Sequence, residues 1–157
     1  MDKKERIRKY GEVFTPQWVF ERMCNDLEKE NPDAFLPGST FLEPSCGEGI
    51  FIAEVLRRKF SRCKKRSDYT TSIASVYGFE LQAENVKTTI GNIVAICQEY
   101  FRPSKSDLQL ISDHIIQADA LKVMKMMSDP ALQETGRNQK LTEEMEIKMS
   151  KYGGTGQ

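Results

Sequence analysis

The stretch that decides the fold is FLEPSCGEGIFIAEVL, residues 41–56. It opens with a short apolar run ending in Glu43, turns through glycines at positions 47 and 49, and closes with a second apolar run. The first run is typical of a short buried strand, whereas the second repeats its apolar residues at helical spacing. A strand, a glycine turn and a helix in this order predict an α/β unit whose turn approaches a ligand closely.

Composition limits the classes of protein that fit the rest of the chain. The 157 residues suffice for one domain, and 23 basic against 23 acidic residues give no net charge, so bulk charge neither favours nor excludes nucleic acid. Four scattered cysteines and one histidine disfavour a zinc site and a disulfide framework, and the thiols fit a reducing cytoplasm. The sequence has no secretory signal and no apolar run of about 20 residues, so no membrane partner is expected.

Strands and helices are predicted to alternate along the chain. The stretch starting TPQWVF has Thr15 as a capping residue and Pro16 at the first helical position. Strands are expected at residues 40–43, 71–80 and 114–119, and helices follow them at residues 51–60, 83–101 and 120–127. The intervening basic run, residues 57–66, is interpreted as a solvated loop, with a phosphate-contacting patch as the alternative.

This alternation predicts parallel strands joined by right-handed crossovers. The expected fold class is therefore α/β, with an incomplete parallel sheet, helices on both faces and a ligand at the carboxyl ends of the strands. Residues 1–127 are expected to form this domain. Residues 128–157 are expected to form a polar tail, with a short helix followed by disorder.

Each predicted strand ends in an acidic residue. Glu43 suits an ammonium group, Glu80 suits the two hydroxyls of a ribose, and Asp119 suits the exocyclic amine of an adenine. The turn is not a dinucleotide fingerprint, because Ile52 stands where the third glycine would be, and it lacks the G-K-[ST] of a P-loop. An amino acid, a ribose and an adenine together describe S-adenosylmethionine.

Four motifs in order resemble the N6-adenine-specific DNA methyltransferases with the gamma arrangement of motifs. GEVFTPQWVFERM is similar to motif X of that family, LEPSCGEGIFI to motif I, VYGFELQAENV to motif II and QADAL to motif III. The resemblance implies a Rossmann-like class I methyltransferase fold and S-adenosylmethionine as cofactor. It also implies a restriction-modification or phage-type setting with DNA as the partner of the complete enzyme.

The resemblance assigns cofactor contacts to motif residues, and each has a plainer interpretation. The glycine turn could be an ordinary strand-to-helix connection, Glu80 a solvated strand end, Asp119 a helix cap, and the F-T-P stretch a cap with a hydrophobic staple. Trp18 is expected to be partly buried near the pocket. The assigned contacts are Phe14, Thr15, Pro16, Glu43, Pro44, Ser45, Cys46, Gly47, Gly49, Phe51, Glu80, Leu81, Asp119 and Ala120.

The family's fourth motif, [DNS]-P-P-[YFW], binds the target base, and no stretch of this sequence matches it. The nearest is S-D-P-A at residues 128–131, which lacks the second proline and the aromatic residue. No catalytic residue and no metal ligand are therefore assigned, and no methyl transfer is expected from this chain alone.

The first strand should also have an unpaired edge, which invites pairing with another chain. We expect a fragment of a longer enzyme, an assembly with itself or with a catalytic or target-recognition subunit, or an edge covered by the C-terminal segment. Binding of DNA by this chain alone should be weak or absent. Two alternatives stay open: a non-catalytic methyltransferase-like subunit, and a methyltransferase acting on RNA or on a protein amide.

Overall fold

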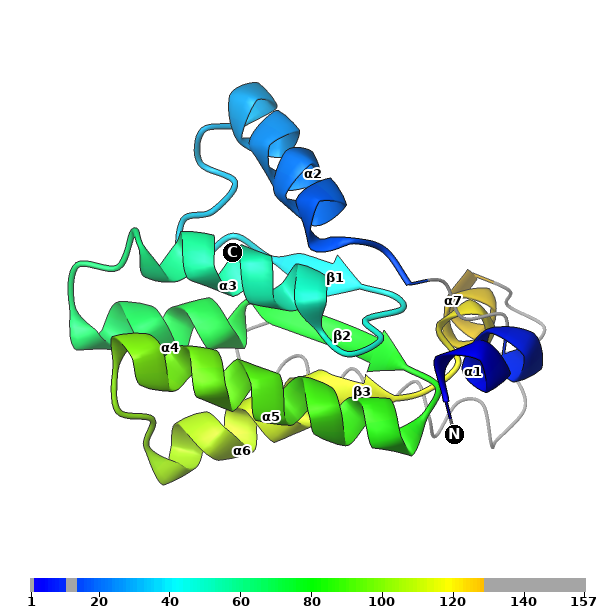
Figure 1. The fold of residues 1–157 in the computed structure, drawn as a ribbon. Coiled ribbons are helices and arrows are strands. Elements are labelled where there is room, and N and C mark those ends of the chain that lie inside the picture. Colours follow the sequence, from blue (N-terminus) through cyan, green and yellow to red (C-terminus); the bar gives the residue numbers. More distant parts are fainter. Residues whose placement is uncertain (1, 11–13, 129–157) are drawn as a thin grey trace.

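The computed structural model describes residues 2–10 and 14–128, which form an α/β fold around a small parallel sheet (Figure 1). The strands are β1 (Phe41–Glu43), β2 (Val76–Glu80) and β3 (Ile115–Gln117), and they lie side by side in the order β1-β2-β3. The parallel sheet predicted from the sequence is confirmed. The described helices are α1 (Lys3–Tyr10), α2 (Gln17–Glu30), α3 (Ile50–Phe60), α4 (Arg66–Ala74), α5 (Ala83–Tyr100), α6 (Lys105–His114) and α7 (Ala120–Ser128).

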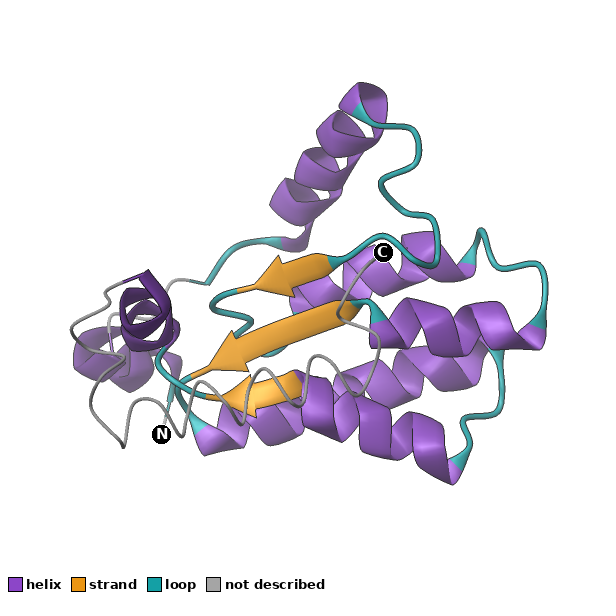
Figure 2. Ribbon diagram, turned by 180° about the vertical axis from the view of Figure 1, so that it is seen from behind, coloured by secondary structure: helices purple, strands orange, loops and turns teal. Residues whose placement is uncertain are grey.

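Helices α3 to α6 gather on one face of the sheet (Figures 1 and 2). The packing there is close, because a Cβ atom added at Gly78 of β2 would lie 2.8 Å from Cδ1 of Ile52 in α3. Val123 of α7 packs with Phe79 of β2 and Ile116 of β3. Figures 1 and 2 place α7 beyond the tips of the strand arrows, so no described helix covers the opposite face, and the expected helices on both faces are not found in the described residues.

Residues 71–80 were expected to be a single strand, and this is wrong for the first half. Helix α4 continues to Ala74, and β2 begins only at Val76. The cause is the helix start: the Asp68 carboxylate accepts the backbone N–H groups of Lys64 and Lys65 at 2.8 and 3.2 Å. This cap overrides the β-propensity of the Thr-Thr-Ser-Ile stretch that follows it.

The basic run at residues 57–66 is only in part the solvated loop expected from the sequence, because only residues 61–65 lie between helices. It completes α3 and begins α4, and its cations pair with acids of neighbouring helices. Arg58 reaches Glu54 at 2.7 Å and Glu28 at 3.2 Å. Arg66 reaches Asp107 of α6 at 2.6 Å. Most of the run therefore ties α3 and α4 to the rest of the fold.

Lys59 is the buried member of this run, with no exposed surface. Its ammonium group donates hydrogen bonds to the backbone carbonyls of Leu36, Pro37 and Ser39, which lie in the connection between α2 and β1. Burial lowers the pKa of this amine to about 8. The lysine thus donates to three carbonyl groups of the irregular segment between α2 and β1.

Helix α6 was not predicted, and it shortens the third expected strand. Its start is fixed by a capping box, in which the Ser104 hydroxyl accepts the N–H of Asp107 at 3.1 Å and the Asp107 carboxylate accepts the N–H of Ser104 at 2.9 Å. His114 ends this helix and is not a strand residue, so β3 begins at Ile115.

The start of α2 also differs from the expectation. The residue before the helix is Pro16 rather than Thr15, and no side chain caps the helix. Trp18 is 63% exposed, so it is not the partly buried residue that was expected. The expected polar tail falls almost wholly in residues 129–157, outside the described residues. Among the helices of the described part, none has the length and apolar character needed to span a bilayer.

Candidate functional site

The candidate site lies at the edge of the sheet where the strands end. Glu43 is the last residue of β1 and Glu80 is the last residue of β2. Because both strands are parallel, these two carboxylates and the turn after β1 share this edge (Figure 1). The sequence-predicted glycine turn is therefore placed between two acids.

The turn after β1 is held in one conformation by its glycines and by β2. The N–H of Cys46 donates to the carbonyl of Phe79 at 2.9 Å, which docks the turn onto the neighbouring strand. Gly47 and Gly49 have φ values of +54° and +86°, a backbone region that residues with a Cβ atom adopt at a cost. Gly49 directly precedes α3, so its left-handed conformation sets the direction in which the helix starts.

Glu80 binds the turn. Its Oε2 accepts the N–H of Gly47 at 2.7 Å, and its Oε1 accepts from the N–H of Gln82 at 3.2 Å and the Nδ2 of Asn85 at 3.5 Å. The residue is only 6% exposed. The contact joins the first and second predicted motifs through one carboxylate, whose remaining lone pairs can still accept from a ligand.

Helix α5 supports the same turn from outside the sheet. The Thr89 hydroxyl donates to the carbonyl of Gly47 at 2.8 Å, and the Asn92 amide donates to the carbonyl of Glu48 at 2.8 Å. Sequence reasoning missed both residues. They are about one turn apart on α5. The apolar periodicity of this helix predicts its buried face, but it does not indicate which residue a polar side chain will bind.

Burial raises the pKa of two side chains in the turn, those of Glu43 and Cys46. Glu43 is half-buried, and burial raises the pKa of its carboxyl group although the N–H of Ser45 donates to Oε1 at 3.1 Å. Its other carboxylate oxygen accepts no hydrogen bond from the described residues. Burial raises the pKa of the Cys46 thiol to about 12, so this thiol stays protonated and is not a nucleophile. Pro44 is exposed in the same turn.

Asp119 and Ala120 follow β3 at the same edge of the sheet. The Oδ1 atom of Asp119 accepts the N–H groups of Leu121 and Lys122 at 3.1 and 3.3 Å, so the side chain caps α7. This is the plainer of the two interpretations weighed for Asp119, and its second oxygen remains available to a ligand. Leu81, which follows Glu80, is 51% exposed.

The F-T-P stretch lies next to helix α1. The ring centroid of Phe14 is 4.5 Å from the Lys3 ammonium and 5.0 Å from the Arg6 guanidinium carbon. Phe51, at the start of α3, packs instead against Phe20 of α2, with ring centroids 5.4 Å apart. Phe51 therefore packs toward α2, and the ring of Phe14 lies under two cations.

Arg6 is a further residue near the turn that was not predicted from the sequence. Its guanidinium donates to the Glu48 carboxylate at 3.0 Å and to the Asn85 amide oxygen at 2.9 Å. Since Asn85 also contacts Glu80, the N-terminal helix is connected to the end of β2. The sequence around Arg6 is a charged stretch without apolar periodicity, which hid this role.

The geometry fits a ligand with amino and hydroxyl groups. No atom lies within 4 Å of the point where Gly47 would carry a Cβ, so the turn is open to close approach there. Glu43 supplies a free carboxylate oxygen, and Glu80 supplies lone pairs next to Gly47. Residues 2–10 and 14–128 contain no group of three or more His, Cys, Asp or Glu side chains that could hold a metal ion.

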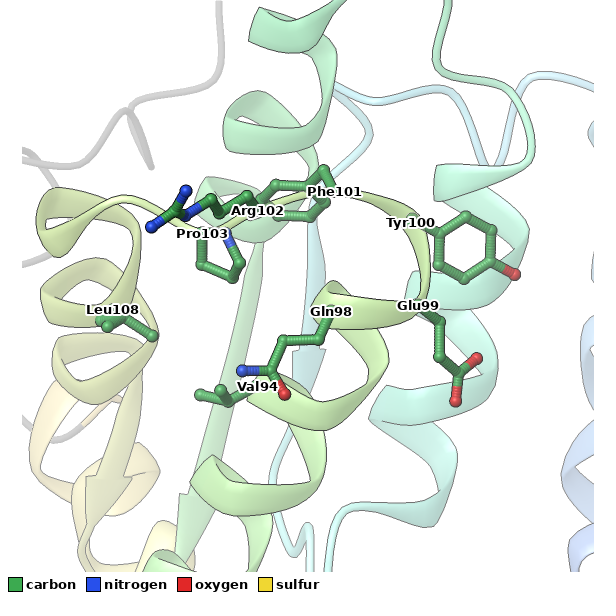
Figure 3. A pocket seen from close by; sticks show the side chains of 8 residues that line it. All are labelled: Val94, Gln98, Glu99, Tyr100, Phe101, Arg102, Pro103 and Leu108. Carbon is green, nitrogen blue, oxygen red and sulfur yellow. The ribbon is translucent and has the colours of Figure 1, made fainter.

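A pocket of about 560 Å³ lies at the other end of the sheet, between the end of α5 and the start of α6 (Figure 3). None of the sequence-predicted site residues lines it. Its wall includes the exposed ring of Tyr100 and the Arg102 side chain, so it is a shallow surface feature. The lining residues are Val94, Gln98, Glu99, Tyr100, Phe101, Arg102, Pro103 and Leu108.

Comparison of the chain with protein-family models, with curated proteins and with solved structures gives no match. The functional interpretation therefore depends on the sequence motifs and on the geometry of the strand-end edge.

Proposed function

We propose that the chain is the S-adenosylmethionine-binding part of an adenine-specific N6 DNA methyltransferase, built on a Rossmann-like class I fold. The observation that carries the proposal is the contact between the Gly47 N–H and the Glu80 carboxylate at 2.7 Å. It joins the glycine turn of the first motif to the acid of the second at the carboxyl edge of a parallel sheet. Ligands of open α/β sheets bind at this edge.

The proposed roles follow from the charge and position of each group. The free oxygen of Glu43 accepts from the ammonium of the cofactor, and the remaining lone pairs of Glu80 accept from the ribose hydroxyls. The second oxygen of Asp119 accepts from the adenine amine. The cofactor supplies an electrophilic methyl group on a sulfonium, and this chain's residues bind and orient it.

Calorimetry with S-adenosylmethionine and S-adenosylhomocysteine tests the proposal. We expect one-to-one binding, weakened roughly 10- to 100-fold in the Glu43→Gln variant, because one charge-assisted hydrogen bond contributes about 1.5–3 kcal/mol. Glu99→Gln, on the exposed end of α5, is the matched control and should bind as the parent does. A folded chain that binds neither compound contradicts the proposal.

The chain lacks an acceptor-binding motif, so we propose that a partner or a further part of the protein supplies it. Incorporation of labelled methyl groups into unmethylated DNA by the purified chain, above a sample without protein, would contradict this. In the described residues β1 pairs only with β2, and Leu42 in β1 is 47% exposed.

That open edge favours the second candidate function, a non-catalytic methyltransferase-like subunit that acts by assembly. Gel filtration with light scattering tests it. A monomer that is unchanged on dilution counts against self-assembly, whereas a dimer or larger species supports it. A methyltransferase of RNA or of a protein amide fits the same cofactor roles, and it would be favoured if either substrate were methylated in place of DNA.

A further inference from the structure

Two basic segments of the chain, residues 57–66 and helix α1, differ in how many of their charged side chains are paired with acids. In the run at residues 57–66 the arginines are paired with acids, as Arg57 is with Glu99 at 3.9 Å, and Lys59 is buried. Only Lys64 and Lys65 of that run are exposed without an ion pair in the described part of the chain. Helix α1, KKERIRKY, contains five basic residues and one acidic residue.

The inward side of α1 anchors it to the candidate site. Arg6 is its least exposed described side chain, with 15% of the side-chain surface accessible, and it donates to Glu48 and Asn85. Lys3 lies over the ring of Phe14. An eight-residue helix is not stable by itself, so these contacts and its capping residues hold it in place. They hold it next to the glycine turn.

The outward side of α1 carries free charge. Lys4 and Arg8 are four residues apart, and therefore lie on one face of the helix. Both are exposed, and neither has an acidic partner among the described residues. Figure 1 places α1 at the end of the sheet to which the strand arrows point, the same end as Glu43 and Glu80.

We propose that α1 is a nucleic-acid contact: anchored by Arg6, it presents Lys4 and Arg8 to the phosphate backbone that carries the methyl acceptor. This inference rests on the proposed function. Lysine and arginine contacts to phosphate position a nucleic acid without reading its sequence. A basic helix at the carboxyl edge of the sheet suits an acceptor that must approach the cofactor at that edge.

The location of α1 distinguishes it from the other free basic pair. Lys64 and Lys65 lie in the turn between α3 and α4, at the opposite end of the sheet (Figures 1 and 2). A nucleic acid bound there would be separated from the proposed cofactor site by the length of the sheet. The two pairs carry equal charge and all four side chains are exposed, so Lys64 and Lys65 serve as the comparison, although the Asp68 carboxylate lies next to them.

Fluorescence anisotropy with a labelled DNA duplex of about 20 base pairs tests the inference, with salt varied from about 50 to 200 mM. The full chain should bind weakly at low salt. In the variant Lys4→Gln/Arg8→Gln the slope of log affinity against log salt should fall by about two, the value for two lost phosphate contacts. The control Lys64→Gln/Lys65→Gln should keep the parental slope.

Three outcomes overturn the inference: no binding of DNA at low salt, equal losses in the two double variants, or a loss only in the control. A matched RNA duplex shows whether the contact prefers one kind of nucleic acid, and loss of DNA binding in the α1 variant supports the contact. Calorimetry with S-adenosylmethionine on the same α1 variant keeps this test separate from that of the proposed function. Unchanged cofactor binding with lost nucleic-acid binding is the expected pair of results.

Discussion

Substitution of Gly49 by alanine should destabilise the chain through two separate effects. With φ at +86°, the new Cβ sits in the left-handed region, which costs about 1–2 kcal/mol. That Cβ would also lie 2.8 Å from Cγ2 of Thr89, whose side chain is fully buried. Overpacking of this kind costs roughly 1–3 kcal/mol, so the free energy of unfolding should fall by about 2–5 kcal/mol in total.

The neighbouring Gly47 separates the two effects. Its φ is +54°, yet no atom lies within 4 Å of the position of its Cβ. The Gly47→Ala variant therefore keeps the backbone penalty and lacks the clash, and both variants share the same change in the unfolded state. The difference between them should be the overpacking contribution of about 1–3 kcal/mol.

Thr89→Ser completes the test, because it removes the clashing methyl group and keeps the hydroxyl that donates to Gly47. In a double-mutant cycle read from urea denaturation followed by circular dichroism, the pair Gly49→Ala/Thr89→Ser should recover much of the loss. Equal destabilisation by Gly47→Ala and Gly49→Ala, or no recovery with Thr89→Ser, would refute the reasoning.

Three further changes have definite expected results in the same denaturation assay. The hydroxyl of Tyr77 is buried without a hydrogen-bond partner among the described residues, so Tyr77→Phe should stabilise the fold by about 1 kcal/mol; a loss of stability would contradict this. Burial lowers the pKa of His114, the only histidine, so the unfolded state binds more protons below about pH 6.5 and stability should fall between about pH 7 and 5. That fall should be smaller in His114→Gln, and an unchanged fall would assign it elsewhere. Ser104→Ala removes the cap of α6 and should cost about 1 kcal/mol, with no effect expected only if the Asp107 half of the capping box suffices.

The parts of the fold predicted from the sequence are those with a strong local pattern. The short apolar run before Glu43, the glycine turn and the long apolar periodicity of residues 83–100 each specify one conformation. Three described helices were not predicted, α1, α4 and α6, and the starts of the last two are fixed by hydrogen bonds of the Asp68 and Ser104 side chains. Their interiors contain β-branched or mixed residues, so propensity alone gave no helix there.

The sequence predicted the residues of the candidate site that belong to local motifs. It did not predict contacts between segments that are distant in the sequence. Strand-end acids and glycines can be identified from local sequence because strand direction fixes where they gather. Arg6, Thr89 and Asn92 contact the turn from helices that are distant in sequence, and a single sequence contains no record of such pairs. The same limit applied to the basic run, whose arginines are neutralised by acids on α2, α5 and α6.

The reactivity of Lys59 can report on local opening of the structure around it. Its amine is enclosed by three backbone carbonyls, so reagents that acylate lysines in water have no path to it while the connection between α2 and β1 stays closed. The exposed Lys4, Lys64 and Lys65 would be labelled at once. The rate at which Lys59 acquires label therefore measures how often this connection opens, and any partner that pairs with the neighbouring edge of β1 should slow that rate.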